Sequence, residues 1–174
     1  MGAKTQTCSR IIVLEPHEAR WQTAVDLGAT HVQDPGTTGN PGATAREIVL
    51  KGVNCAFDPA GIPASLTATM AAPGSKAVFG IVGGCARQNA RSWRSHPISV
   101  STVGHTIKGT IEGDSDPDSF ILELIPHYQA GPLPSARLHK AFLLRRINTA
   151  IADQHSGRCI KAVRIADHVE GDAA

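Results

Sequence analysis

Short runs of apolar residues alternate with longer stretches in which apolar residues recur at helical spacing. The short runs are rich in Val, Ile and Ala and end at glycine, proline or an acidic residue, which is typical of buried strands. They predict strands over residues 11–14, 31–32, 53–57, 77–82, 106–111 and 159–165. The longer stretches predict helices over residues 18–27, 44–51, 65–72, 116–130 and 145–154. This alternation indicates an α/β fold with a mostly parallel sheet.

Single residues refine the expected helix boundaries. Thr44 is expected to cap the second helix, and Gly52 to end it. Asp116 followed by Pro117 is a strong start for the fourth helix, because proline suits the first helical position. Pro126 inside that helix predicts a kink or an early end.

Composition narrows the class of protein. Apolar residues make up 41% of the chain and charged residues 18%, which is typical of a globular protein rather than a disordered one. The formal net charge of +2 is too small to indicate nucleic acid or an anionic membrane as a partner. No apolar run approaches the roughly 20 residues of a membrane span, and segment 1–10 is too polar for a secretory signal. We therefore expect a cytoplasmic protein.

The cysteines give no sign of a metal site. They are isolated and widely spaced, and no Cys-x-x-Cys or zinc-finger spacing occurs, so we expect reduced, structural thiols. No Ser/His/Asp or Cys/His arrangement indicates a catalytic nucleophile either. No catalytic or metal-binding residue is therefore assigned.

Candidate ligand contacts lie at the carboxyl ends of the predicted strands, where ligands bind in open parallel sheets. Glu15 follows the first strand, and a carboxylate there can accept hydrogen bonds from the ribose hydroxyls of an adenosine. The same charge would repel a 2′-phosphate, which favours NAD over NADP. Arg20, one helical turn later, could reach the same ribose. Taken alone, the two residues are better explained as a solvated ion pair at a helix start.

Three further features have both a binding and a plain structural interpretation. Turns 58–61 and 81–84 contain small residues that let a ligand approach the backbone, although ordinary turn chemistry also explains them. Lys161 leaves a tight turn and could meet a pyrophosphate, but an isolated lysine is more often a surface residue. No Gly-x-Gly-x-x-Gly fingerprint occurs in the chain.

Five ordered motifs resemble one enzyme family. Residues 106–115 (TIKGTIEGDS), 147–153 (INTAIAD) and 156–161 (SGRCIK) resemble the C-terminal region of medium-chain zinc-dependent alcohol dehydrogenases, the aryl- or benzyl-alcohol branch above all. Residues 8–15 (CSRIIVLE) and 27–32 (LGATHV) look like the second and third strands of that family's coenzyme domain.

The resemblance implies NAD as coenzyme and gives ten positions a role in binding it. Glu15 and Arg20 match the ribose contacts, and Lys161 matches the pyrophosphate contact. The remaining positions match contacts to adenine, nicotinamide and its carboxamide: Pro59, Ala60, Val82, Gly83, Gly84, Thr110 and Glu112.

The chain departs from the family's pattern in length. Family members are roughly twice as long, and their first half carries the zinc ligands, which are absent here. The first strand and the glycine-rich phosphate loop are also expected to be missing. We therefore expect an incomplete Rossmann-type parallel sheet over residues 1–112, with open strand edges, and a segment 113–174 that in the family returns to the catalytic domain. Pro126 and segment 138–146 differ from the family's usual residues.

Two functions follow from this resemblance. One is the C-terminal part of an NAD-dependent, zinc-type alcohol dehydrogenase that is not catalytic alone. The other is a non-catalytic remnant that binds weakly or associates with a second copy or a related subunit through its exposed strands.

Overall fold

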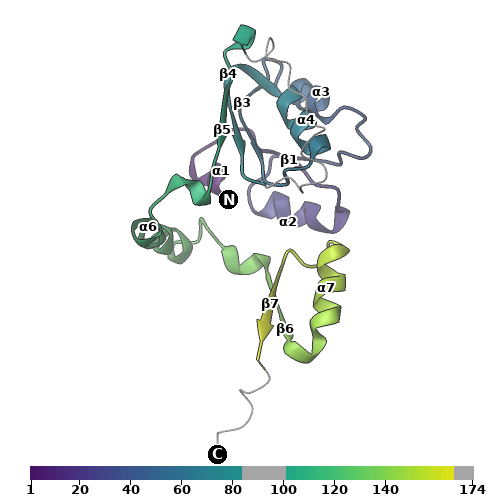
Figure 1. Cartoon of the computed structure of the whole chain (residues 1–174), viewed down its shortest axis with the longest axis vertical. Coiled ribbons are helices and arrows are strands. Elements are labelled where there is room, and N and C mark those ends of the chain that lie inside the picture. Colours follow the sequence, from purple (N-terminus) through teal and green to yellow (C-terminus); the bar gives the residue numbers. More distant parts are fainter. Residues whose placement is uncertain (84–100, 167–174) are drawn as a thin grey trace, which may run out of the picture. The chain divides into compact units, whose positions relative to one another are not determined.

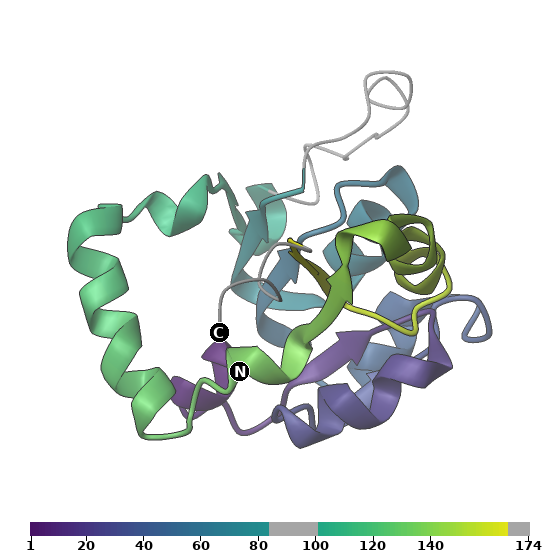
Figure 2. The ribbon, with the colours of Figure 1, turned by 90° about the horizontal axis from the view of Figure 1, so that it is seen from below.

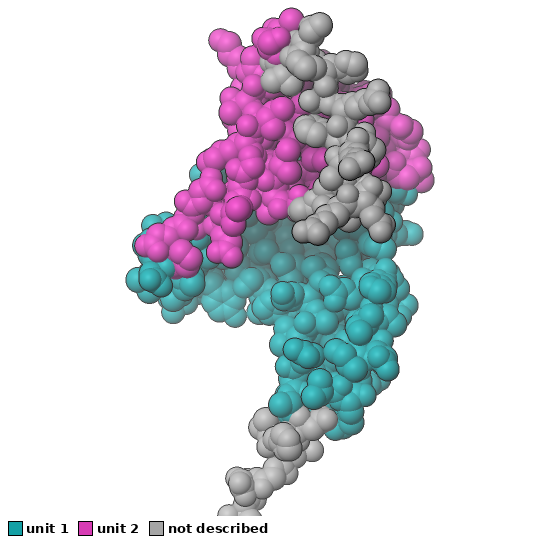
Figure 3. All heavy atoms as spheres, viewed as in Figure 1, with its two compact units in different colours: residues 1–34, 118–174 teal, residues 35–117 magenta. Residues whose placement is uncertain are grey.

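The computed structural model describes residues 1–83 and 101–166 and divides into two compact units (Figures 1 and 3). Unit 1 combines the two ends of the chain, residues 1–34 and 118–174, and unit 2 is the continuous segment 35–117. Gly84, one of the predicted coenzyme contacts, lies outside the described residues. All paired strands are parallel within the described parts, which confirms the predicted α/β class.

Unit 2 is a three-stranded parallel sheet with two helices packed together beside it (Figure 1). Its strands, in the order β3-β4-β5, are Val53–Asp58, Pro73–Ile81 and Thr106–Gly109. Helices α3 (Pro41–Ile48) and α4 (Pro63–Ala71) precede and follow β3.

The core of unit 2 joins the sheet to α4. Phe79 of β4 and Ala56 of β3 pack with Leu66 of α4, and Phe79 is only 1% exposed. Gly42 brings α3 against α4, because a Cβ there would collide with Ala71. The unit is therefore built from elements that are close in sequence, each covering its neighbour.

Unit 1 contains two separate two-stranded parallel sheets. The first pairs β1 (Ile12–Leu14) with β2 (His31–Gln33), and the second pairs β6 (His139–Leu143) with β7 (Lys161–Ile165). Its helical elements are α1 (Gly2–Thr5), η1 (Glu18–Arg20), α2 (Trp21–Asp26), η3 (Ser135–Leu138), η4 (Leu144–Arg146) and α7 (Ile147–His155). Helix α6 (Pro117–Gln129) begins at the boundary between the units.

A small core in unit 1 joins the β6–β7 sheet to α7. Phe142 of β6 and Ala150 of α7 are buried against Cys159, with Ala162 beside them. Figure 2 shows the same ribbon from below. Cys159 is free and buried, as expected of a structural thiol, whereas Cys8 and Cys55 are free but exposed, so they do not fit that expectation.

Three local features bear on the sequence predictions, and two of them differ from what was expected. Asn40, not Thr44, caps α3: its side-chain oxygen accepts from the backbone N–H of Ala43 at 3.1 Å, and Pro41 takes the first helical position. Helix α6 runs from Pro117 to Gln129, close to the predicted range, and continues past Pro126, so of the two effects expected of that proline the early end does not occur. Strand β6 was not predicted, because segment 138–146 has no clear alternation of apolar and polar residues.

The expected open strand edges are present in the described parts of the chain. There β1 pairs with β2 and with no other strand, and β3 pairs with β4 alone, so each offers one unpaired edge. Within residues 1–83 and 101–166, no helix has the length and apolar character needed to cross a membrane.

Candidate functional site

The predicted coenzyme contacts fall into two groups, one within each unit. Unit 2 carries its group on three turns that follow β3, β4 and β5, at the carboxyl edge of the sheet. Parallel neighbours place these turns side by side, since Asp58 pairs with Ile81 and Ile81 with Gly109. Pro59 and Ala60 lie on the first turn, Val82 and Gly83 on the second.

The first turn is organised by the side chain of Asp58, the last residue of β3. Oδ1 of Asp58 accepts hydrogen bonds from the backbone N–H groups of Ala60 and Gly61, both at 2.8 Å. Oδ2 accepts from the hydroxyl of Ser65, in the first turn of α4, at 2.7 Å. Asp58 is 1% exposed, so this carboxylate shapes the turn from inside.

The second turn is in backbone contact with the first. The carbonyl oxygen of Asp58 accepts from the N–H groups of Val82 and Gly83 at 3.0 and 3.3 Å. A Cβ on Gly61 would collide with the carbonyl of Gly83, and a Cβ on Gly83 would collide with the backbone of segment 59–61. Gly61 also has a φ of +65°, which glycine adopts at little cost. The two turns therefore form a single surface with few side chains.

The third turn carries Thr110 and Glu112. The N–H of Thr110 donates to the carbonyl of Ile81 at 2.9 Å, which ties this turn to the second. Glu112 and Asp114 have φ values of 49° and 53°, so residues with side chains occupy the left-handed region here. Lys108, 2.7 Å from Oδ2 of Asp114, lowers the pKa of that carboxyl through a hydrogen bond.

Glu15 begins the corresponding turn in unit 1, after β1. Its Oε1 accepts from the backbone N–H of His17 at 2.9 Å, and the indole N–H of Trp21 donates to its carbonyl at 2.8 Å. Its side chain is 18% exposed, and its Oε2 lies 3.7 Å from an Nη1 of Arg20. The carboxylate is thus fixed in direction yet still accessible.

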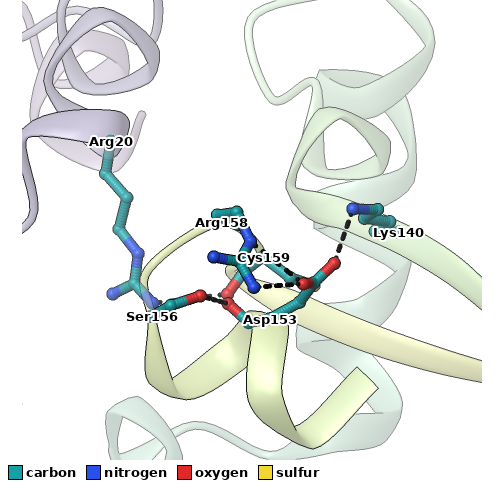
Figure 4. A network of polar contacts seen from close by, with 6 residues as sticks. All are labelled: Arg20, Lys140, Asp153, Ser156, Arg158 and Cys159. Carbon is teal, nitrogen blue, oxygen red and sulfur yellow. Dashed lines mark hydrogen bonds and ion pairs between the residues drawn. The ribbon is translucent and has the colours of Figure 1, made fainter. Parts of the chain in front are cut away.

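Arg20 is engaged with a different part of unit 1. Its Nε donates to the carbonyl of Gly157 at 3.1 Å, and its Nη2 donates to the carbonyls of Gln154 and Cys159 at 3.2 and 3.3 Å. Figure 4 shows its side chain directed at the turn between α7 and β7. Arg20 therefore connects the Glu15 turn to the turn that precedes Lys161. Three of the five N–H groups of its guanidinium are engaged there, and Nη1 lies beside Glu15.

Beside this turn lies an ion-pair cluster that sequence reasoning missed. Asp153 accepts from Lys140 at 2.8 Å and from two nitrogens of Arg158 at 3.1 and 2.9 Å (Figure 4). These hydrogen bonds, that of Lys140 first, lower the pKa of Asp153. In the sequence, the only indication of this cluster is that Asp153 and Arg158 lie five residues apart on either side of the end of α7. Lys161 itself starts β7 and is exposed.

Two other features lie apart from the predicted contacts. A cavity of about 550 Å³ within unit 1 is lined by residues that include Lys4, Asp26, Pro134 and Arg137, none of them predicted as coenzyme contacts.

In the described segments, no group of three or more His, Cys, Asp or Glu side chains is arranged to hold a metal ion.

Comparison with known proteins identifies relatives of the whole described fold. The model of the zinc-binding dehydrogenase family matches residues 1–126. A geraniol dehydrogenase from Castellaniella defragrans is 28% identical over 165 residues, which cover 95% of this chain and 44% of that protein. The crystal structure of benzyl alcohol dehydrogenase from Acinetobacter calcoaceticus is 34% identical with a TM-score of 0.85, over 93% of this chain and 44% of that one.

A second solved structure gives the same result. An alcohol dehydrogenase zinc-binding domain protein from Burkholderia ambifaria is 34% identical with a TM-score of 0.83, and the match covers 92% of this chain and 42% of that one. The chain therefore spans less than half the length of the relatives that it matches.

Proposed function

The chain belongs to the zinc-binding dehydrogenase family, and we propose that it forms the NAD-binding part of an alcohol dehydrogenase of the aryl-alcohol type. Residues 1–112 would supply the coenzyme-binding region, and residues 113–174 the segment that in the family returns to the catalytic domain. The observation that carries this proposal is Glu15, an accessible carboxylate held in a fixed direction at the carboxyl end of a parallel strand.

The chain's own residues would bind and orient the coenzyme. Glu15 would accept hydrogen bonds from the two ribose hydroxyls, and its charge would disfavour a 2′-phosphate. The glycine-bearing surface formed by turns 58–61 and 81–83 would let adenine and nicotinamide approach the backbone closely. Thr110 and Glu112 would support the carboxamide, and Lys161 would meet the pyrophosphate. Bound NAD supplies the hydride acceptor for alcohol oxidation.

Arg20 takes a more specific place in this scheme. Three of its N–H groups already donate to backbone carbonyls. We therefore propose that Arg20 mainly orients Glu15 and the turn before Lys161, and that its contact with the ribose is secondary. Zinc would polarise the alcohol oxygen in such an enzyme. The described residues offer no set of zinc ligands, so we derive no step that involves the metal.

The decisive test is titration of the purified 174-residue chain with NAD and with NADP. We expect very weak binding of NAD, in the millimolar range, and weaker binding of NADP. Replacing the carboxylate in Glu15→Gln should reduce the preference for NAD. An equal response to both coenzymes, or micromolar affinity, would contradict this account. The chain should not oxidise benzyl alcohol with NAD, and robust zinc-dependent turnover would show that it is catalytic alone.

A second candidate function is association with another subunit without catalysis. The open edges of β1 and β3 favour it, since unpaired parallel strands readily accept a partner. So do the exposed side chains of Phe120, Ile121 and Leu122 on α6. Sedimentation of the purified chain tests the second candidate: a second copy as partner predicts a dimer whose formation NAD does not alter. A related subunit as partner predicts a monomer that forms a dimer only when that subunit is added. Free cysteines at positions 8, 55 and 159 suit the cytoplasm that we propose as its location.

A further inference from the structure

Asp58 is the most deeply buried charged side chain among the described residues, and no predicted contact includes it. Its surroundings provide donors in the number and places that an ionised carboxylate needs. Oδ1 receives two backbone N–H groups and Oδ2 receives one hydroxyl. Hydrogen bonds of this kind, from neutral donors to a charged acceptor, are stronger than those between neutral groups. The first turn of α4, with its partial positive charge, lies on the same side.

The hydrogen bonds of Asp58 reach both turns that would face the coenzyme. Its side chain fixes the backbone of Ala60 and Gly61, while its main-chain oxygen fixes that of Val82 and Gly83. A single residue thereby sets the spacing of two turns that touch each other through Gly61 and Gly83. Being buried, its carboxylate cannot itself touch a ligand at the surface.

We propose that Asp58 is a positioning residue for coenzyme binding, which acts by holding turns 58–61 and 81–83 in the geometry that adenine and nicotinamide require. The inference rests on the proposed NAD-binding function and adds to it a residue that touches no part of the coenzyme. Ser65 contributes to this positioning, because its hydroxyl donates a hydrogen bond to Oδ2 of Asp58.

Replacements in the 174-residue chain separate this role from a purely structural one. Ser65→Ala removes a hydroxyl that donates to Asp58 and also lies 3.0 Å from the Ile62 carbonyl. Thr67→Ala is the matched control, because it removes a hydroxyl that donates only to a backbone carbonyl, that of Pro63, on an exposed side of the same helix. Asp58→Asn keeps an oxygen for the N–H groups of Ala60 and Gly61 and an amide that can donate to Ser65. Asp58→Ala removes every side-chain bond and is expected to lower the stability of unit 2 as a whole.

The readouts are backbone amide NMR spectra during titration with millimolar NAD, amide hydrogen exchange and the thermal midpoint. We expect Ser65→Ala to raise the dissociation constant about threefold to tenfold, as the loss of one such hydrogen bond implies. It should speed exchange at Ala60 and Gly61 and lower the thermal midpoint slightly more than Thr67→Ala does, since a buried carboxylate oxygen loses its donor. The dissociation constants are therefore compared well below both midpoints, where each variant is folded. Asp58→Asn should stay within about threefold of the unaltered chain, because its hydrogen bonds survive.

Each contrary result has one meaning. Equal dissociation constants for Ser65→Ala and Thr67→Ala overturn the positioning role while the proposed function stands. Loss of binding in Asp58→Asn with slow exchange at Ala60 and Gly61 overturns it too, since charge rather than turn geometry would then matter. Absence of any NAD-induced shift at Val82 and Gly83 in the unaltered chain contradicts the proposed function itself, and with it this inference.

Discussion

Unit 1 and unit 2 both contain parallel strands, but the contacts that stabilise each unit internally are of different kinds. Unit 2 is a continuous segment in which helix α4, between β3 and β4 in sequence, packs on both strands through a shared apolar core. Unit 1 joins the two ends of the chain, and side-chain hydrogen bonds from Arg20 and Arg137 link those ends. In unit 1, side-chain hydrogen bonds therefore join the two ends of the chain, whereas in unit 2 an apolar core joins the strands to a helix.

Two arginines display this difference directly. In unit 2, Arg46 of α3 donates to the carbonyls of Ala71 and Pro73, at the end of α4, 25 and 27 residues away in sequence. In unit 1, Arg20 makes the same kind of contact across 134 to 139 residues. Arg46 supports two helices that already pack on each other. Arg20 holds together segments that meet only when the chain ends come together.

The largest effect is expected from the core of unit 2. Phe79→Ala removes a fully buried ring and should lower the free energy of unfolding of this unit by about 3–5 kcal/mol. Phe57→Ala is the matched control, because Phe57 lies on β3 of the same sheet but is 59% exposed. Native-state amide hydrogen exchange measures each unit separately. If both replacements cost the same, the core of unit 2 lies elsewhere.

The second prediction concerns the two arginines. Arg20→Ala should destabilise unit 1 by about 2–3 kcal/mol, since three charge-assisted hydrogen bonds are lost, and should expose the amides of residues 156–160 to exchange. Arg46→Ala, with two partly exposed bonds, should cost about 1 kcal/mol and affect unit 2 alone. Arg20→Lys should rescue little, because an ammonium cannot reproduce the planar fork. Equal costs for the two arginines would remove the contrast between the units.

The order of elements could be predicted from sequence because most strands of this chain have strong local signals. The apolar runs at 11–14 and 77–82 and the Asp116-Pro117 start are examples. The cap of α3 was misplaced, because Asn40 and Thr44 both suit a cap and the choice depends on Pro41 at the first turn. Helix α6 tolerates Pro126 since it lies on an exposed helix, where water can satisfy the freed carbonyl.

The candidate site was less accessible to sequence reasoning. Glu15 and turns 58–61 and 81–83 follow from the rule that ligands bind at strand ends. Three features depend on contacts that no local pattern reveals: the hydrogen bonds from Val82 and Gly83 to the Asp58 carbonyl, the engagement of Arg20 with a distant turn, and the pairing of Asp153 with Lys140. Each of them joins groups through the folded backbone rather than through sequence spacing.

A smaller, pH-dependent effect is expected at Asp153. Its pKa is lowered in the folded chain, chiefly by the hydrogen bond from Lys140 and then by that from Arg158. The cluster therefore stabilises unit 1 above the ordinary pKa of an aspartate, 3.8, and this contribution is lost as the pH falls through the lowered folded value. Asp153→Asn should reduce the thermal midpoint at pH 7, and the difference from the unaltered chain should shrink as the pH falls below 3.8. A difference that does not change with pH would assign the effect to packing.

The smallest effect is expected from the pair between Asp26 and Arg137, which also joins the two chain ends of unit 1. The atoms lie 2.7 Å apart, but the side chains are 36% and 51% exposed, so water and salt screen the attraction. The hydrogen bonds from Gln22 and then Arg137 lower the pKa of Asp26. Arg137→Ala should reduce the stability of unit 1 slightly in dilute buffer and not at all in 1 M salt, whereas the effect of Arg20→Ala should persist there. That result would mean that Arg20, and not Arg137, stabilises the contact between the chain ends. If Arg137→Ala lowered the stability of unit 1 in 1 M salt as well, both arginines would contribute to that contact.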